Sequence, residues 1–217
     1  SNDVRGATSL INPADGSAAE RLPLLARTQS SELGLRLRPA PGWNSSVTLW
    51  QAHLDSELVF VGDAGVTEAR GASRRIGIEW SNDYAPTRWL LIDADLALSR
   101  ARFVEAEGGG RHVPNAIPMS ASLSASVTPG GPWSGGLKLR YLGAYALEES
   151  GSEKSQANWT ANLKLGYAIS PKLQLSLDVL NLFNRRANDI EYWGASCTRA
   201  EGAGCKGADG TDGIEGR

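Results

Sequence analysis

The sequence predicts an all-β fold, an antiparallel up-and-down transmembrane β-barrel segment of about eight long strands. Three observations support this prediction: apolar and polar residues alternate, short connections alternate with long ones, and aromatic residues gather near strand ends. A period of two places alternate side chains on opposite faces of a strand, whereas a helix would scatter the same residues around its surface. We therefore expect strands with one apolar face.

The alternation is clearest near the C-terminus, where Leu173, Leu175 and Leu177 are separated by Gln174 and Ser176. The strands predicted in this way are 30–38, 44–56, 72–84, 89–103, 117–127, 133–143, 157–168 and 172–184. Several of them approach the roughly 9–11 residues that a tilted strand needs to cross a bilayer. Strands of soluble proteins are more often about five or six residues long, so strand length favours a membrane protein.

The connections between these strands are alternately short and long. The short ones each contain proline and lie at 39–43, 85–88, 128–132 and 169–171. The long, polar ones lie at 57–71, 104–116, 144–156 and 185–217. Outer-membrane barrels have this arrangement, with tight periplasmic turns and long extracellular loops. The long loops 104–116, 144–156 and 185–217 are therefore the candidates for ligand capture.

Aromatic residues mark both ends of the predicted strands. Near the short turns lie Trp43, Tyr84, Trp89, Trp133 and Tyr167, and near the long loops lie Phe60, Phe103, Tyr145, Trp159 and Phe183. We interpret these as two aromatic girdles at the two membrane interfaces, represented best by Trp43, Tyr84, Trp89, Trp133, Tyr167, Phe103, Trp159 and Phe183. The alternative is that these are the aromatic residues found at strand ends in any β protein.

The polar positions of the strands carry charged residues. A wide membrane barrel has its apolar side chains against lipid and a polar lumen. We therefore predict that these residues face the lumen: Glu79, Asp93, Asp95, Lys138, Arg140, Lys164 and Asp178. In a soluble antiparallel sheet, the same face would simply be exposed to solvent.

Composition excludes several other classes of protein. A net charge of −2 and a pI near 5.8 give no basic surface for nucleic acid. The longest apolar runs are far shorter than the roughly 18 residues of a membrane helix. His53 and His112 are the only histidines, and no Gly-x-Ser-x-Gly motif is present, so we predict no enzyme, no cofactor and no metal site. The spacing of Asp93 and Asp95 is routine for one face of a strand.

Two motifs resemble those of a known family. The run from Leu173 to Asn184, which ends in Asn-Leu-Phe-Asn, resembles the penultimate strand of TonB-dependent receptors. The segment from Arg74 to Trp80 resembles the R-x-x-G-x-E strand of the same family, and 56–63 is similar to a loop of one subgroup. The resemblance extends over nearly the whole chain.

The resemblance implies a partial β-barrel domain over 1–217, with 1–29 and 185–217 as extracellular loops. The complete barrel would have about 22 strands and a plugged lumen. It would lie in the outer membrane of a Gram-negative bacterium and take up a scarce nutrient, such as a siderophore or a similar large solute. The implied partners are outer-membrane lipid, the remaining barrel and plug, the TonB complex through an N-terminal region that this sequence lacks, and an unknown small-molecule ligand. We also expect the final strand of the family to be missing.

Cys197 and Cys205 lie in the last predicted loop, and an exported protein meets an oxidising compartment. We expect them to form a disulfide. The terminal run from Ile214 to Arg217 is interpreted as native loop sequence, although it also matches a protease-cleavage tag. Two alternatives remain open: a self-contained eight-stranded outer-membrane anchor, and a soluble β-sheet binding module.

Overall fold

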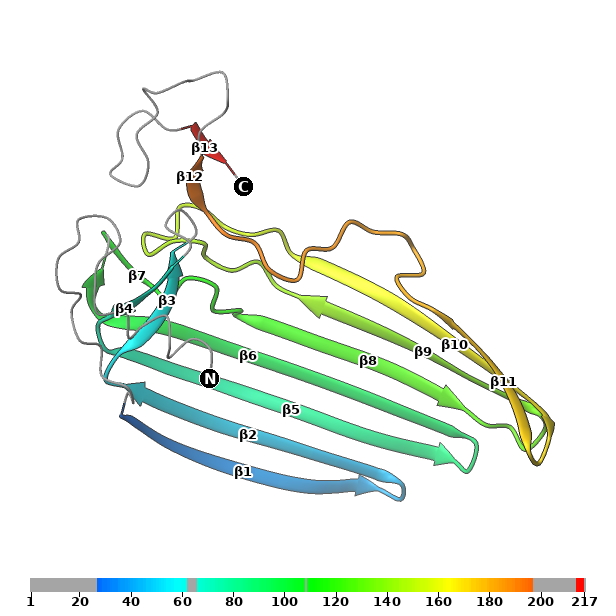
Figure 1. Cartoon of the computed structure of the whole chain (residues 1–217). Coiled ribbons are helices and arrows are strands. Elements are labelled where there is room, and N and C mark those ends of the chain that lie inside the picture. The colour runs from blue at the N-terminus through cyan, green and yellow to red at the C-terminus, as the bar shows by residue number, and fades with distance from the viewer. Residues whose placement is uncertain (1–26, 62–65, 108, 197–213, 217) are drawn as a thin grey trace.

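A computed structural model describes residues 27–61, 66–107, 109–196 and 214–216. Its main feature is one curved antiparallel sheet in the order β1-β2-β5-β6-β8-β9-β10-β11, with β7 paired to β6 (Figure 1). These strands are β1 (Thr28–Ala40), β2 (Trp43–Leu54), β5 (Ser73–Thr87), β6 (Leu90–Glu107), β7 (Gly110–His112), β8 (Met119–Val127), β9 (Trp133–Leu142), β10 (Asn158–Ser170) and β11 (Leu173–Val179). The all-β, up-and-down fold is confirmed.

Each of the eight predicted strands is present in the sheet, and most bounds agree within a few residues. The largest differences are at the loop ends. β6 continues to Glu107, beyond the predicted end, and β11 stops at Val179, five residues before the predicted end at 184. The long loops also contain two short strand pairs, β3 (Glu57–Val61) with β4 (Val66–Arg70), called here the β3–β4 hairpin, and β12 (Gly194–Ser196) with β13 (Ile214–Gly216).

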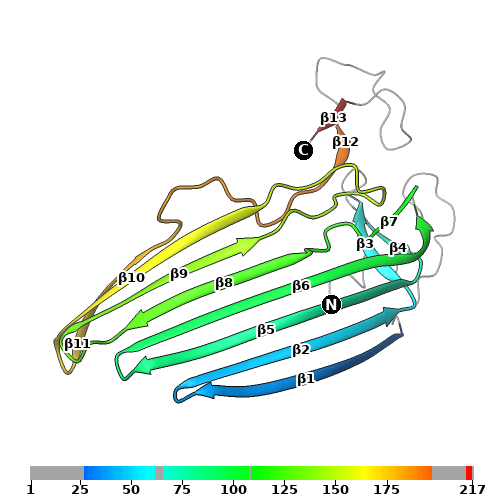
Figure 2. The ribbon, with the colours of Figure 1, turned by 180° about the vertical axis from the view of Figure 1, so that it is seen from behind.

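The predicted turns lie together at one end of the sheet and the long connections at the other (Figure 2). At the turn end, Gly42 has a φ of 74°, and a Cβ there would lie only 2.4 Å from the Ala85 carbonyl oxygen. The Ala85 N–H donates to the Gly42 carbonyl at 2.8 Å. Glycine is required at this position because neighbouring turns approach each other closely and the backbone is left-handed.

Strand register divides the side chains of the sheet into two faces. Directly opposed residues share a face, and Leu163 of β10 is opposite Leu137 of β9 and Val179 of β11. Its neighbour Lys164 is opposite Asp178 on the other side of the sheet. The same alternation holds from β2 to β11, so one face, called here the apolar face, is mainly aliphatic and aromatic. The other, called here the polar face, carries mainly charged, serine and glycine residues.

The apolar face is largely uncovered. Leu33 is 74% exposed, Leu175 59% and Leu177 57%. The buried hydrophobic cluster lies elsewhere, at the loop end, where Phe103 and Val113 pack with Val59. Within the described residues, no helix is long or apolar enough to cross a membrane.

The sheet is open. β1 is paired only with β2 and β11 only with β10, so each of these strands leaves one row of backbone groups unpaired among the described residues. The described strands therefore form part of a barrel wall and do not close on themselves.

Candidate functional site

The charged residues that were predicted to face a lumen all lie on the polar face. Register places Asp95 of β6 opposite Ser81 of β5 and Ser122 of β8. Asp93 is opposite Ser124 one row further toward the turns. The remaining members occupy equivalent positions on their strands: Glu79 on β5, Lys138 and Arg140 on β9, Lys164 on β10 and Asp178 on β11. Their common face is now defined, and their position in a lumen stays a prediction.

Serine hydroxyl groups of β8 hold the carboxylates of β6 in place. Ser124 Oγ donates to Asp93 Oδ2 at 2.9 Å, and Ser122 Oγ donates to Asp95 Oδ2 at 3.1 Å. Each hydrogen bond joins a directly opposed pair, so the alternating serines of β8 supply one donor for each row. A hydrogen bond to a charged group contributes about 1.5–3 kcal/mol when shielded from water, and less on an exposed face.

Basic side chains lie on the neighbouring strands of the same face. Lys164 Nζ is 3.7 Å from Asp178 Oδ1, and an Arg140 guanidinium nitrogen is 3.4 Å from Asp189 Oδ1 in the segment that follows β11. The acids of β5 and β6 and the bases of β9 and β10 meet across β8. The shallow hollow at this junction is lined by both signs of charge: Glu79, Asp95, Ser122, Lys138 and Arg140. Such a surface can bind a polar solute that has donor and acceptor groups.

Long loops cover the polar face at its loop end. Glu57, whose side chain is 8% exposed, accepts two hydrogen bonds of 3.0 Å from the Arg75 guanidinium and a short one from the Ser73 hydroxyl. Arg75 and Ser73 belong to the polar face, because each lies an even number of positions from Glu79 along β5. The β3–β4 hairpin is therefore attached to the polar side of the sheet.

Phe103 differs from its predicted place. It was expected in an outward aromatic girdle, but it lies on the polar face, is only 2% exposed, and packs in the cluster with Val59 and Val113. Burial of the ring under the loops is favoured by the hydrophobic effect, and the period of two places it opposite Ser73 instead of with the lipid-facing positions. The strand period alone places Phe103 on the same face as Asp93 and Asp95, but that the long loops fold over this face was not predicted.

The other long loops are joined to the hairpin and to one another. Arg70 at the end of β4 lies 3.7 Å from Glu149 Oε1, and the His112 backbone N–H donates to the Glu149 carbonyl at 2.9 Å. Further on, the Glu191 backbone N–H donates to Tyr145 Oη at 2.7 Å. We call the described residues 57–61, 66–70, 109–117, 144–156 and 189–191 the loop cap. Parts of all three predicted capture loops belong to it.

Glu148 organises the 144–156 loop. Its carboxylate accepts hydrogen bonds from Ser152 N–H at 2.9 Å, Ser152 Oγ at 3.0 Å and Glu153 N–H at 3.3 Å, and from the Ser150 hydroxyl and N–H. Partial burial raises the pKa of this carboxyl, but the hydrogen bonds from Ser150, Glu153 and Ser152 together outweigh that effect and lower the pKa to about 2. The charged form of Glu148 is therefore part of the loop structure.

The two histidines lie in different parts of the sheet, far from each other in the chain. His112, at the end of β7, packs against Gly151 of the 144–156 loop, where a Cβ would lie 2.5 Å from the imidazole ring. His53 lies on the apolar face at the end of β2, 3.8 Å from Asp55. Cys197 and Cys205 lie outside the described residues.

The Asn-Leu-Phe-Asn motif forms the turn that ends β11. Asn181 and Asn184 have φ values of 50° and 48°, a left-handed conformation that asparagine tolerates better than most residues. The Asn181 side chain accepts from the Arg185 N–H at 3.0 Å and donates to the Arg185 carbonyl at 2.8 Å. Its backbone N–H donates to Asn162 Oδ1 at 2.9 Å. The motif thus explains why β11 stops early.

Six of the other predicted girdle residues form three ring pairs on or beside the apolar face, whereas Tyr145 is buried in the loop cap. At the turn end, the ring centroids of Trp43 and Tyr84 are 5.7 Å apart and those of Trp133 and Tyr167 are 4.5 Å apart. At the loop end, Trp159 and Phe183 are 5.5 Å apart, and the Arg185 guanidinium lies 4.7 Å from the Trp159 ring. Trp89 is in the turn before β6 and is 47% exposed. Contact with membrane interfaces stays a prediction for this set.

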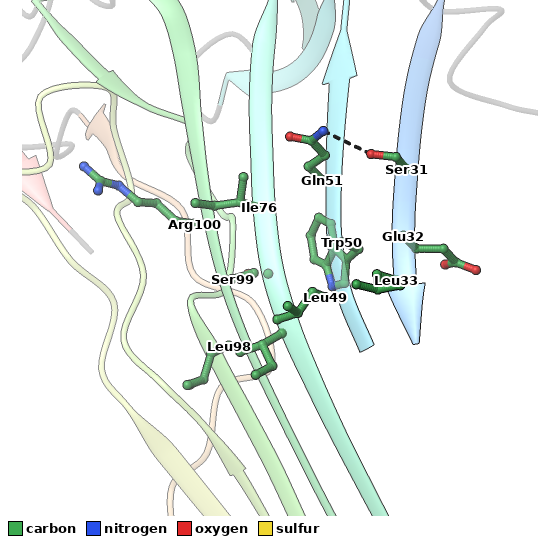
Figure 3. A pocket seen from close by; sticks show the side chains of 12 residues that line it. Ser31, Glu32, Leu33, Leu49, Trp50, Gln51, Ile76, Leu98, Ser99 and Arg100 are labelled. Carbon is green, nitrogen blue, oxygen red and sulfur yellow. Dashed lines mark hydrogen bonds between the residues drawn. The ribbon is translucent and has the colours of Figure 1, made fainter. Parts of the chain in front are cut away.

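A second hollow lies near the loop end between β1, β2, β5 and β6 (Figure 3). Most of its lining residues belong to the apolar face: Ser31, Leu33, Leu49, Gln51, Ile76, Ile78, Leu98 and Arg100. Gln51 Nε2 donates to Ser31 Oγ at 3.0 Å across one edge of it. The hollow is therefore mainly apolar, with polar groups at the side nearest the loops.

Comparison with known proteins gives a consistent result. Residues 16–182 match the family model described as TonB dependent receptor-like, beta-barrel. Among solved structures, the ferric-catecholate import receptor Fiu from E. coli K12 is 21% identical with a TM-score of 0.60, covering 74% of this chain and 24% of that one. The ferric yersiniabactin uptake receptor FyuA from Yersinia pestis is 19% identical with a TM-score of 0.62, covering 74% and 25%.

The ferric preacinetobactin receptor BauA from Acinetobacter baumannii is 16% identical with a TM-score of 0.59, covering 81% of this chain and 28% of that one. At these identities the likeness concerns the fold. The chain spans about a quarter of the length of the solved structures that it matches. A search of curated proteins found no match.

Proposed function

Since this chain belongs to the TonB-dependent receptor-like β-barrel family, we propose that it is part of the wall of an outer-membrane receptor for a scarce nutrient. The nutrient is a siderophore or a similar large solute, and uptake is coupled to energy through TonB. The family is one of transporters and receptors, and we propose that this chain likewise has no enzymatic role.

One observation carries the proposal: the two faces of the sheet have opposite character over the full width from β2 to β11. A lipid-facing surface needs exposed aliphatic side chains, and a solute path needs hydrogen-bonding groups. The lumen-facing residues are then Glu79, Asp93, Asp95, Lys138, Arg140, Lys164 and Asp178. The aromatic girdle residues on the opposite face are Trp43, Tyr84, Trp89, Trp133, Tyr167, Trp159 and Phe183.

The orientation follows from the loops. Outer-membrane barrels have short periplasmic turns, so the loop cap lies on the extracellular side and covers the outer mouth of the lumen. Segments 1–29 and 185–217 are extracellular in this arrangement, although β1 already begins at Thr28. A disulfide between Cys197 and Cys205 belongs to the same proposal. The partners are outer-membrane lipid, the remaining barrel with its plug, the TonB complex and a small-molecule ligand.

The two alternatives are less compatible with the described sheet. A self-contained eight-stranded barrel requires β1 and β11 to pair, and both are edge strands among the residues that the structure describes. A soluble binding module would have to cover aliphatic side chains such as Leu33 and Leu175, which are more than half exposed. Large exposed apolar surfaces are rare on soluble monomers.

The proposal is tested by uptake of labelled ferric siderophores into cells that produce the complete receptor. We expect receptor-dependent uptake of at least one ferric complex, abolished when the proton gradient is collapsed. The variant Lys138→Gln/Arg140→Gln should reduce uptake at an unchanged amount of receptor in the outer membrane. The control Arg88→Gln/Lys172→Gln removes the same charge at the turn end and should have no effect. Complete receptor that is folded and monomeric in plain buffer without detergent would refute the proposal.

A further inference from the structure

Three arginines gather at the loop end of the apolar face. Arg74 of β5 and Arg102 of β6 are directly opposed, and Arg100 lies two positions nearer the turn end of β6. All three have side chains at least partly exposed. We call Arg74, Arg100 and Arg102 the basic cluster. It continues toward β2, where His53 is directly opposed to Arg74.

The charges of this cluster have no acidic partner in the described part of the chain. Like charges directly opposite each other on a sheet are destabilising. Arg74 donates to the Gln51 side-chain carbonyl at 3.4 Å, which is a neutral acceptor. The carboxylate of Asp55 lies beside His53 at 3.8 Å, and no ion pair among the described residues involves an arginine of the cluster. An external anion would relieve the repulsion.

The position of the cluster along the strand identifies the surrounding medium. Arg74 and Tyr84 lie on the same face of β5, ten residues apart. Ten residues extend about 33 Å along a strand, and a tilt of about 35–45° reduces this to about 25 Å in height. That is the height of the apolar band of an outer-membrane barrel. With Tyr84 at the periplasmic interface, Arg74 therefore lies in the headgroup layer of the outer leaflet.

The mainly apolar hollow adjoins the cluster on its membrane side. Arg100 is one of its lining residues, and Leu33, Leu49 and Leu98 line the part that lies toward the turns (Figure 3). Aliphatic side chains below a cationic rim match a lipid, because its acyl chain is apolar and its headgroup can carry phosphate. A free phosphate ion has no apolar group that could contact these aliphatic side chains.

We propose that the basic cluster and this hollow form a binding site for an outer-leaflet lipid with a phosphate-bearing headgroup. The guanidinium groups of Arg74, Arg100 and Arg102 bind the phosphate, for which arginine offers paired donors in a planar arrangement. The hollow takes an acyl chain of the same lipid. The site rests on the proposed function, since it requires the apolar face to lie in the outer membrane.

The test uses the complete receptor in detergent, with lipid A as the phosphate-bearing lipid and its dephosphorylated form as the lipid control. Binding is measured by native mass spectrometry. We expect retention of lipid A and about 30-fold weaker binding to Arg100→Gln/Arg102→Gln, since each cation near an anionic lipid contributes about a fivefold effect. The control Arg36→Gln/Arg88→Gln removes the same charge from the polar face and the turn end and should bind as the unaltered receptor does.

Heat-dependent gel mobility distinguishes failure of the lipid site from failure of the proposed function, because a folded barrel shows this mobility whether or not the lipid binds. The single variant Arg100→Gln, at an exposed position, serves if the double variant does not fold, and about fivefold weaker binding is expected from it. Equal binding of the dephosphorylated lipid, or unchanged binding by the variants in a folded barrel, would overturn the lipid site. Full displacement of lipid A by inorganic phosphate would also overturn the lipid site, because the basic cluster would then bind the phosphate ion alone.

Discussion

The contact between Glu57 and Arg75 is expected to hold the β3–β4 hairpin on the polar face. The variant Glu57→Gln keeps the size of the side chain but replaces one acceptor oxygen with an NH2 group. This group would face the guanidinium, which offers only donors. The substitution should therefore disrupt the paired hydrogen bonds of 3.0 Å and leave Arg75 without its carboxylate.

The size of the effect follows from burial of the two side chains. Removal of one member of a buried ion pair costs about 3–5 kcal/mol. Glu57 is 8% exposed but Arg75 is 34% exposed, so water can solvate part of the cation that remains. We therefore expect a loss of about 2 kcal/mol in the free energy of opening of the hairpin, after a discount for that solvation.

Hydrogen exchange of the complete receptor in detergent measures this opening. A loss of about 2 kcal/mol corresponds to about 30-fold faster exchange of the β3–β4 amides, because about 1.4 kcal/mol is a factor of ten. Exchange within β8 and β9 should not change. The control Glu32→Gln removes the same charge from an exposed site on β1 and should leave the hairpin protected.

A double-mutant cycle tests whether Glu57 and Arg75 act as a pair. In Glu57→Gln/Arg75→Gln, neither charge is left uncompensated, so the loss should be clearly smaller than the sum of the two single losses. Additive losses, or exchange of the hairpin that is unchanged in Glu57→Gln, would show that this ion pair does not attach the hairpin to the sheet.

Three further predictions concern other parts of the loop end. Phe103→Ala should lower barrel stability by about 3–5 kcal/mol, measured by the temperature of the heat-dependent mobility change, and Phe103→Leu by less; equal effects would contradict the buried cluster. The pKa of Glu148 is lowered to about 2 in the folded loop, so its stabilising effect is present above the unfolded pKa near 4.5 and is lost as pH falls from there toward 2. Limited proteolysis of 144–156 with pepsin should show this transition, and Glu148→Gln should be cleaved readily across the range. Asn181→Gly keeps the left-handed backbone but loses the two side-chain hydrogen bonds to Arg185, so it should destabilise the turn by about 1 kcal/mol, and Asn181→Ala by more. The measurement is exchange of the Asn184 amide, which donates to the Asn181 carbonyl in every variant, and the reverse order would refute this explanation of the motif.

Local patterns were sufficient for the strands and turns. Alternation placed Lys164 and Leu163 on opposite faces because the strand period is two, and proline and glycine located the turns. The end of β11 was predicted five residues too late. The apolar positions change phase after Val179, because Leu180 and Leu182 fall on the face opposite to Leu177, and the left-handed conformation of Asn181 follows.

The loop cap could not be predicted from local patterns. The contacts that build it join residues far apart in the chain, such as Arg70 with Glu149 and Tyr145 with Glu191. Phe103 was predicted on the wrong face although alternation along β6 places it with Asp93 and Asp95, because its position near a strand end resembles that of a girdle residue. The residues that bury it, Val59 and Val113, lie in other segments. The sequence showed that Asp93 lies on a polar face, but its hydrogen bond with Ser124 could be identified only from the strand register.

The central claim is that the apolar face lies against lipid and the polar face lines a lumen. Spin labels at successive positions of β10 in the reconstituted complete receptor test it most directly, with Cys197 and Cys205 replaced by serine. We predict that accessibility to oxygen is highest at Leu163 and Leu165, and that accessibility to a water-soluble nickel reagent is highest at Asn162 and Lys164. The opposite phase, or equal access of the nickel reagent to all four positions, would contradict the account.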